Sequence, residues 1–208
     1  MIAVCGHTSR TQRAFDLSRE IGAGLVLDDG TVGSNANHDR AWRYAASGGS
    51  QWSIVVEDDA VPIAEFGVHA VQMLKSLRGA PGIVSFYMGT SYPIQVQSKY
   101  KNALARADEI GAGWIKGDGV YHGVAVAIRT KDVPHMLKYV KNIDKPYDER
   151  LSDWARSECF PCWYTNPSLV DHEDSDPVLP ASRWQPRDKA RRAWRTGAPL
   201  NKARYVDM

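Results

Sequence analysis

The stretch WSIVVEDDAVP, residues 52–62, decides the fold of this chain. Its apolar first half is typical of a buried strand, and three carboxylates, Glu57, Asp58 and Asp59, follow directly. Three neighbouring like charges repel one another, and moving any of them out of water is costly. A positively charged group is therefore expected at the end of this strand.

Segments with strand and helix patterns alternate on both sides of this stretch. Strands are expected at residues 2–6, 24–30, 52–59, 82–89, 121–128 and 162–172, and helices at residues 8–22, 34–49, 66–77, 133–140 and 148–158. Residues 90–116 show no clear period. This alternation predicts an α/β fold, an α/β/α sandwich with a mostly parallel central sheet.

Acidic residues follow two of these strands. Asp28 and Asp29 end the second strand, and the three carboxylates end the third. Ligands of parallel α/β sheets bind at the carboxyl ends of the strands. Clustered carboxylates there favour Mg²⁺ or Mn²⁺, which takes one or two protein carboxylates and fills its other positions with water and substrate phosphates. The pattern predicts a phosphorylated substrate.

Other phosphate chemistries fit less well. A haloacid-dehalogenase phosphatase needs D-x-D-G-T, but Leu27 stands where the VLDDGTV stretch would need the nucleophile. The chain contains no P-loop motif G-x-x-x-x-G-K-[ST]. A metal-dependent nuclease stays an alternative, although no second cluster of acids with a lysine accompanies the first. A non-catalytic nucleic-acid-binding module is a further alternative, but it leaves the carboxylates at two strand ends unexplained.

Two motifs carry a resemblance to a known family. VVEDDAVP (residues 55–62) resembles the DxD-type motif of the GT-A glycosyltransferases, and PSLVDHEDSDP (residues 167–177) resembles a late segment of several bacterial members. The resemblance covers most of residues 1–180. It implies a GT-A-like, Rossmann-like fold, a nucleotide-diphosphate sugar as donor, and Mn²⁺ or Mg²⁺ as cofactor. The predicted activity is that of a hexosyltransferase-type glycosyltransferase.

The resemblance also implies roles for residues of the central motifs. Asp59 and His172 would hold the metal. Glu57 and Asp58 would orient the ribose or a metal-bound water. The metal would neutralise charge that develops on the leaving diphosphate.

Further site residues follow from the same resemblance. Asp28 or Asp29 would meet the nucleoside. GSNANHDRAW resembles the helix that lines the donor site, which makes Asn37 and Arg40 candidates. If the enzyme inverts the anomeric centre, it needs a base, and Asp148 in YDERLSDW is the first choice. A helix N-cap is an equally good explanation of Asp148.

The charge of the chain is unevenly distributed. Residues 181–208 carry eight basic side chains against Asp188 and Asp207, a net charge of +6, so the first 180 residues sum to −4 within the total of +2. The basic residues are Arg183, Arg187, Lys189, Arg191, Arg192, Arg195, Lys202 and Arg204. A catalytic domain is therefore expected at 1–180 and a basic tail or helix at 181–208. Such a tail suggests a polyanionic partner, although a simply solvated helix is the alternative.

The acceptor is predicted from this tail. Basic groups bind phosphates, and Trp184, Trp194 and Tyr205 offer rings for stacking on bases. In size and plan the chain resembles small phage enzymes that glycosylate hydroxymethylated pyrimidines such as 5-hydroxymethylcytosine in DNA. The alternative is a lipid-linked or surface-glycan acceptor, because the same motifs resemble bacterial lipooligosaccharide glycosyltransferases. The sequence shows no signal peptide or membrane span, which predicts a cytoplasmic protein, in the host cytoplasm if phage-encoded.

Overall fold

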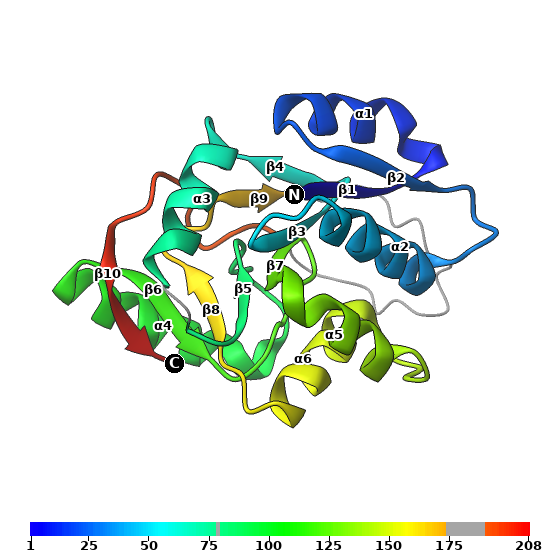
Figure 1. Cartoon of the computed structure of the whole chain (residues 1–208). Helices are drawn as coiled ribbons and strands as arrows, with labels where there is room; N and C mark the ends of the chain where they lie inside the picture. The colour runs from blue at the N-terminus through cyan, green and yellow to red at the C-terminus, as the bar shows by residue number, and fades with distance from the viewer. Residues whose placement is uncertain (78–79, 174–189) are drawn as a thin grey trace.

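A computed structural model describes residues 1–77, 80–173 and 190–208 of the chain. Figure 1 shows a central sheet with helices packed on both of its faces. The predicted α/β sandwich is confirmed at this level.

Ten strands and six α-helices make up the described part of the chain. The strands are β1 (Ile2–His7), β2 (Gly24–Asp28), β3 (Trp52–Glu57), β4 (Ala60–Pro62), β5 (Ile83–Ser85), β6 (Ala112–Gly117), β7 (Ala125–Arg129), β8 (Cys162–Thr165), β9 (Val170–His172) and β10 (Asn201–Asp207). The α-helices are α1 (Thr11–Glu20), α2 (Ser34–Ser47), α3 (Phe66–Ser76), α4 (Ile94–Ile110), α5 (Val133–Val140) and α6 (Tyr147–Ser157). Short 3-10 helices, η1 (Thr8–Arg10) and η2 (Thr130–Asp132), precede α1 and α5.

Eight strands form the main sheet in the order β10-β6-β8-β5-β7-β3-β1-β2. Four neighbouring pairs are parallel, namely β1 with β2, β1 with β3, β5 with β8, and β6 with β10. The other three pairs, β3 with β7, β5 with β7, and β6 with β8, are antiparallel. The sheet is therefore mixed, with parallel pairs only slightly in the majority. Strands β1, β2, β3, β5 and β8 all end at the same edge, which becomes the edge that carries the acids.

Apolar side chains on the two faces of the sheet form two separate cores. One core packs α1 and α3 on one face, and the other packs α2, α4, α5 and α6 on the opposite face. Successive residues of β3 alternate between them, because Ile54 and Val56 belong to the first core and Val55 to the second. This two-sided burial explains why the strand reads as a continuous apolar run in the sequence.

Helix α4 occupies the region for which the sequence gave no prediction. Its buried face consists of Val96, Tyr100, Ala103, Leu104 and Ala107. These positions do have helical spacing, but small alanines supply part of the face and mask its period in a hydropathy reading. The helix ends at Gly111, whose φ of 63° suits a glycine cap.

The last residues of the chain form a strand rather than the expected helix. Within the described segment 190–208, β10 pairs in parallel with β6 and occupies one edge of the main sheet. The helical form of the basic tail is therefore wrong for these residues. Trp184, Arg187 and the other tail residues up to Lys189 lie outside the described part of the chain. The division of the chain at residue 180 stays a prediction.

Candidate functional site

The three carboxylates lie at the edge where β3 ends. Glu57 is the last residue of β3, Asp58 and Asp59 form a turn, and the chain continues as β4. Strand β4 pairs with β9, and this register places Ala60 opposite His172. The pairing brings His172 beside Asp59 although the two residues are far apart in sequence.

A guanidinium group provides the positive partner expected for these acids. Arg10 Nη1 lies 3.1 Å from Asp58 Oδ1 and 3.3 Å from Asp59 Oδ2. The other Asp58 oxygen accepts a hydrogen bond of 3.0 Å from the backbone N–H of His7. Burial nevertheless raises the pKa of Asp58. Both oxygens of Asp58 are therefore engaged by the protein itself.

Asp59 and His172 form a buried pair with unused bonding capacity. Asp59 Oδ2 lies 3.3 Å from His172 Nε2, and the two side chains are 12% and 2% exposed. Asp59 Oδ1 and His172 Nδ1 are buried without a hydrogen-bond partner among the described residues. Although burial acts in the opposite direction, the charges and hydrogen bonds of His172 and the arginines hold the pKa of Asp59 below its usual value. Asp59 is therefore an ionised carboxylate, and its Oδ1 has no hydrogen-bond partner among the described residues.

Asp59 and His172 suit a divalent cation better than the cluster of Glu57, Asp58 and Asp59 does. Among the described residues there is no group of three or more His, Cys, Asp or Glu side chains arranged to hold a metal. Mg²⁺ and Mn²⁺ sites of phosphate-transfer enzymes often have only one or two protein ligands. Unsatisfied buried polar atoms also point to an ion, water or ligand that they bind. Asp59 and His172 suit such a site, whereas Asp58 is occupied by His7 and Arg10.

A second group of side chains surrounds Glu57. The ring of His38 stacks on that of Tyr147, with centroids 3.8 Å apart and an interplanar angle of 22°. His38 Nε2 lies 3.2 Å from Glu57 Oε1, and Nδ1 lies 2.8 Å from the carbonyl oxygen of Ser34. Gly123 allows this packing, because a Cβ there would come within 2.5 Å of the Tyr147 ring and 3.0 Å of Glu57.

Asp148 is the carboxyl group closest in character to a catalytic base. Burial and the negative charge of Glu57 raise the pKa of Asp148 to about 7. The N-cap of α6 is Pro146, so Asp148 is not the cap that the alternative explanation required. Its Oδ1 accepts a hydrogen bond of 3.0 Å from the N–H of Glu149, and the group is half-buried.

Asp28 and Asp29, at the end of β2, have different roles in the structure. Asp28 is buried, and its oxygens accept hydrogen bonds from the backbone N–H groups of Gly30, Val32 and Gly33 at 2.9 to 3.1 Å. It therefore holds the loop that leads into α2. Asp29 is exposed and accepts hydrogen bonds from Thr31. Of the two acids, Asp29 is the one that solvent and ligands can reach.

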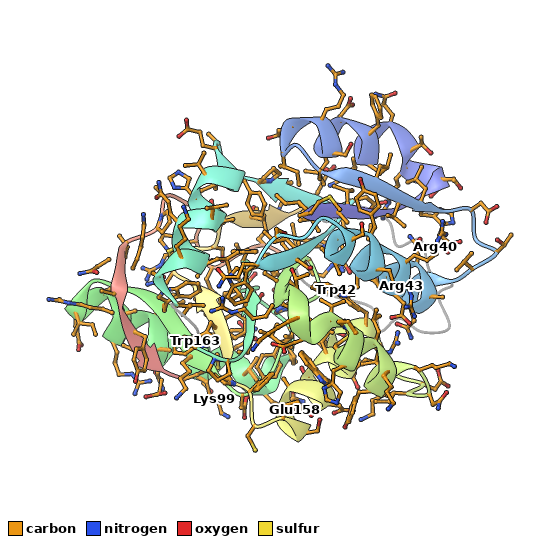
Figure 2. The ribbon with its side chains drawn as sticks, viewed as in Figure 1. Arg40, Trp42, Arg43, Lys99, Glu158 and Trp163 are labelled. Carbon is orange, nitrogen blue, oxygen red and sulfur yellow. The ribbon has the colours of Figure 1, made fainter. Side chains whose placement is uncertain are left out.

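Asn37 and Arg40, the candidates on α2, also differ in their surroundings. Asn37 is buried, and its Nδ2 donates hydrogen bonds to the carbonyl oxygens of Gly6 and Val26 at 3.0 and 3.4 Å. These bonds fix α2 against β1 and β2. Arg40 is exposed, and its Nη1 lies 3.2 Å from the carbonyl oxygen of Leu27. Figure 2 shows Arg40 on the outer side of α2, close to where β2 ends, whereas Trp42 points inward.

A segment from the basic tail crosses this site, which the sequence did not reveal. Residues 190–197, here called the C-terminal strap, hydrogen-bond to two loops beside the acids. Backbone bonds run from Thr90 N to Arg192 O, from Trp194 N to Met88 O and from Ser168 N to Arg195 O, at 2.7 to 3.1 Å. Asp171 Oδ1 accepts a further bond of 2.7 Å from the N–H of Ala193. The strap is thereby hydrogen-bonded to the loop that follows β5, to the residues that precede β9, and to β9 itself.

The strap brings two arginines to the acids. Arg192 Nη1 lies 3.5 Å from Asp171 Oδ2, and the charge of Arg191 helps to lower the pKa of Asp59. Other basic residues of the tail lie elsewhere. Arg195 pairs with Asp108 at 2.7 Å, and Arg204 hydrogen-bonds to the carbonyl oxygen of Ile110. The described basic residues therefore do not share one face.

Tyr87 is a further site residue that sequence reasoning missed. It follows β5, is 1% exposed, and packs its ring edge-on against that of His122 with centroids 5.1 Å apart. Its ring centroid lies 6.1 Å from that of His172. In the sequence Tyr87 reads as one more apolar residue of a buried strand, so no local signal marks it.

A cavity of about 610 Å³ lies at the opposite end of the strands. Lys116, Arg156, Trp163 and Tyr205 are among the residues that line it, and none of the predicted site residues does. Figure 2 labels Trp163 near the start of β8, away from the edge where β3 ends. Separately, none of the described helices is both long and apolar enough to cross a lipid bilayer.

Comparisons with known proteins add little. No protein-family model and no curated protein matches the chain. Among solved structures, "Crystal Structure of A197 from STIV" is similar at 10% identity and a TM-score of 0.48, over 84% of this chain and 86% of that one. A likeness of this size carries no argument about function.

Proposed function

We propose that this protein is a metal-dependent glycosyltransferase that moves a sugar from a nucleotide-diphosphate sugar to a hydroxyl acceptor. One observation carries the proposal. The buried Asp59–His172 pair has an unpartnered oxygen and nitrogen among the described residues, and Asp59 closely follows Glu57, whose charge, together with burial, raises the pKa of Asp148 to about 7. A cation site together with a carboxyl group that can accept a proton suits the transfer of a group from a phosphate.

The residues have separate tasks in this proposal. Asp59 and His172 would hold Mn²⁺ or Mg²⁺, which when bound supplies charge neutralisation for the diphosphate. Arg10 keeps Asp58 and Asp59 in place and adds a positive charge at the same edge. The exposed Asp29 and Arg40 are the proposed contacts to the nucleoside. Asn37 and Asp28 would act indirectly, because they fix the loop and helix that carry those contacts.

Asp148 acts as the base in the proposed reaction. Its carboxylate accepts the proton of the acceptor hydroxyl while the hydroxyl oxygen forms a bond to the anomeric carbon. The bond from that carbon to the diphosphate oxygen breaks, and the electron pair leaves with the diphosphate. A single displacement of this kind inverts the anomeric centre. Since Glu57 raises the pKa of Asp148, it also makes Asp148 a stronger base at neutral pH.

The acceptor proposed from the sequence is a hydroxymethylated pyrimidine in DNA. Two features support a polyanionic acceptor. They are the net positive charge of the tail and the exposure of Arg204 on the edge strand β10. Against it, Arg191 and Arg192 lie by the acids and not on a separate surface. Transfer to a hydroxymethylcytosine oligonucleotide, with an unmodified oligonucleotide as control, tests this choice. Donor hydrolysis without transfer to the DNA would contradict it.

Thermal unfolding with a panel of nucleotide sugars tests the activity itself. In the presence of Mn²⁺, one donor should raise the unfolding temperature of the wild type, and EDTA should abolish the rise. The Asp59→Asn variant keeps the shape of the side chain but removes its charge, so it should lose the response. Asp16→Asn, at an exposed position on α1, is the matched control. Absence of any metal-dependent rise in the wild type would overturn the proposal.

A further inference from the structure

The hydroxyl group of Tyr87 is buried without a hydrogen-bond partner among the described residues. A buried polar atom of this kind costs stability, so native proteins rarely leave one without a reason. The Tyr87 ring lies between two histidines. Its centroid is 5.1 Å from that of His122, which it meets edge-on, and 6.1 Å from that of His172, to which it is tilted. The ring position is therefore fixed by packing, whereas the hydroxyl contributes nothing to the fold that the described residues reveal.

Charged groups surround this hydroxyl. Burial and the nearby carboxylates Asp171 and Asp59 raise the pKa of Tyr87, and the charges of Arg191 and Arg192 act in the opposite direction. A tyrosine hydroxyl is protonated at neutral pH in any case and can donate a hydrogen bond. Neither carboxylate accepts that bond in the structure, which leaves the donor available to a ligand.

The strap that carries these arginines is hydrogen-bonded to the loop that follows Tyr87. Trp194 N donates to Met88 O at 2.9 Å, directly after Tyr87 in the chain, and Thr90 N donates to Arg192 O at 2.7 Å. These bonds tie residues 190–197 to the loop that follows β5. Tyr87, Asp59, His172 and Arg191 thus come from four separate parts of the chain and lie near one another.

We propose that the Tyr87 hydroxyl donates a hydrogen bond to a phosphate oxygen of the nucleotide diphosphate bound at this site. The proposal rests on the proposed function, and it adds a binding residue that neither the motifs nor the resemblance assigns. A phosphate oxygen suits the mixed surroundings, because the arginines would attract the anion while Asp59 and His172 would hold the cation that accompanies it. A neutral donor completes the site without adding further charge. Tyr87 binds the leaving group and transfers no proton.

The Tyr87→Phe variant tests this role, because it removes the hydroxyl and keeps the ring. Isothermal titration calorimetry with inorganic pyrophosphate, at saturating Mn²⁺ and pH 7.5, gives the affinity directly. Loss of one hydrogen bond to a charged acceptor should weaken pyrophosphate binding about 10- to 100-fold. Affinity for Mn²⁺ alone should be unchanged. Tyr100→Phe is the matched control, since Tyr100 is also fully buried and its hydroxyl lies 3.5 Å from that of Tyr164, away from the acids.

Thermal unfolding separates a binding role from a structural one. Without ligand, Tyr87→Phe should unfold at a temperature about 2–4 °C above that of the wild type, because it removes an unsatisfied buried group. A clear decrease would show that the hydroxyl stabilises the fold, and would overturn the binding role.

The titrations also separate the two proposals. Wild-type affinity for pyrophosphate in Tyr87→Phe would overturn the role of Tyr87 and leave the proposed function standing. If the wild type bound no pyrophosphate with Mn²⁺ present, the proposed function and the role of Tyr87 would fall together.

Discussion

At the scale of single residues, Asp148 has a strongly raised pKa for an aspartate. Its pKa of about 7 arises from burial and from Glu57, so half of the molecules carry the proton near neutral pH. A base must be ionised to accept a proton. Below pH 7, kcat/KM should therefore fall about tenfold per pH unit, and above pH 7 it should level off.

The Asp148→Asn variant checks this assignment through sugar transfer. Removal of the base should lower kcat by about 100- to 10,000-fold and remove the titration near pH 7 from the rate profile. Asp153→Asn is the control on the same helix, because Asp153 pairs with Lys145 and Arg156, and it should keep both the rate and the profile. A mild effect of Asp148→Asn, with the inflection retained, would assign the base to another group.

Asp148→Asn should also change how the free energy of unfolding depends on pH. The folded pKa of about 7 lies above the ordinary aspartate pKa of 3.8, which applies to the unfolded chain, so the folded state binds the proton more tightly. The ionised form therefore costs stability progressively as the pH rises from about 4 to 7. Asp148→Asn should raise the free energy of unfolding by roughly 1–3 kcal/mol more at pH 8 than at pH 4. Urea unfolding at the two pH values measures the difference.

At the scale of elements, the C-terminal strap depends on one side chain of β9. Asp171 accepts hydrogen bonds from the N–H groups of Ala193 and His172 at 2.7 and 2.8 Å, and it pairs with Arg192. Without this carboxylate, the strap should detach more easily and take Arg191 away from Asp59.

Hydrogen exchange measured by mass spectrometry tests this dependence. In Asp171→Ala, amides of residues 190–197 should exchange faster than in the wild type, while those of β1 and β3 should stay protected. Asp144→Ala, at an exposed position between α5 and α6, provides the comparison. Unchanged protection of the strap would mean that its backbone bonds to Met88 and Thr90 suffice to hold it.

At the scale of the whole molecule, the described C-terminal residues pack against the main sheet. Strand β10 pairs with β6, and the Tyr205 ring packs edge-on against that of Trp163 with centroids 5.4 Å apart. Val206 and Met208 pack against one of the two cores. These contacts join the end of the chain to β6 and β8, the two strands next to it in the sheet.

Deletion of residues 201–208 therefore tests the architecture rather than the acceptor. Loss of the edge strand should lower the free energy of unfolding by about 2–4 kcal/mol, since several cross-strand pairs and apolar contacts disappear. A detachable tail would instead leave stability unchanged, and chemical unfolding distinguishes the two results. For the same reason, Lys202→Gln and Arg204→Gln are better probes of acceptor binding than any truncation.

The sequence determined those features that rest on local pattern. Apolar runs and helical spacing are properties of neighbouring residues, so most of the strands, most helices and the acidic ends of β2 and β3 could be predicted, whereas β4, β6 and β10 were not. The same patterns placed Asp59 at a strand end, and the resemblance paired it with His172, which the β4–β9 register brings beside it. Helix α4 was missed because its alanines weaken the signal, not because the signal is absent.

The tertiary structure decided which distant residues meet. Arg10 pairs with Asp58 and Asp59, and the strap supplies Arg191 from the far end of the chain. The antiparallel pairings of β7 and the edge position of β10 likewise depend on contacts between elements. No local pattern encodes such contacts, because their stability comes from the joint burial of surfaces that become neighbours only when the chain has folded.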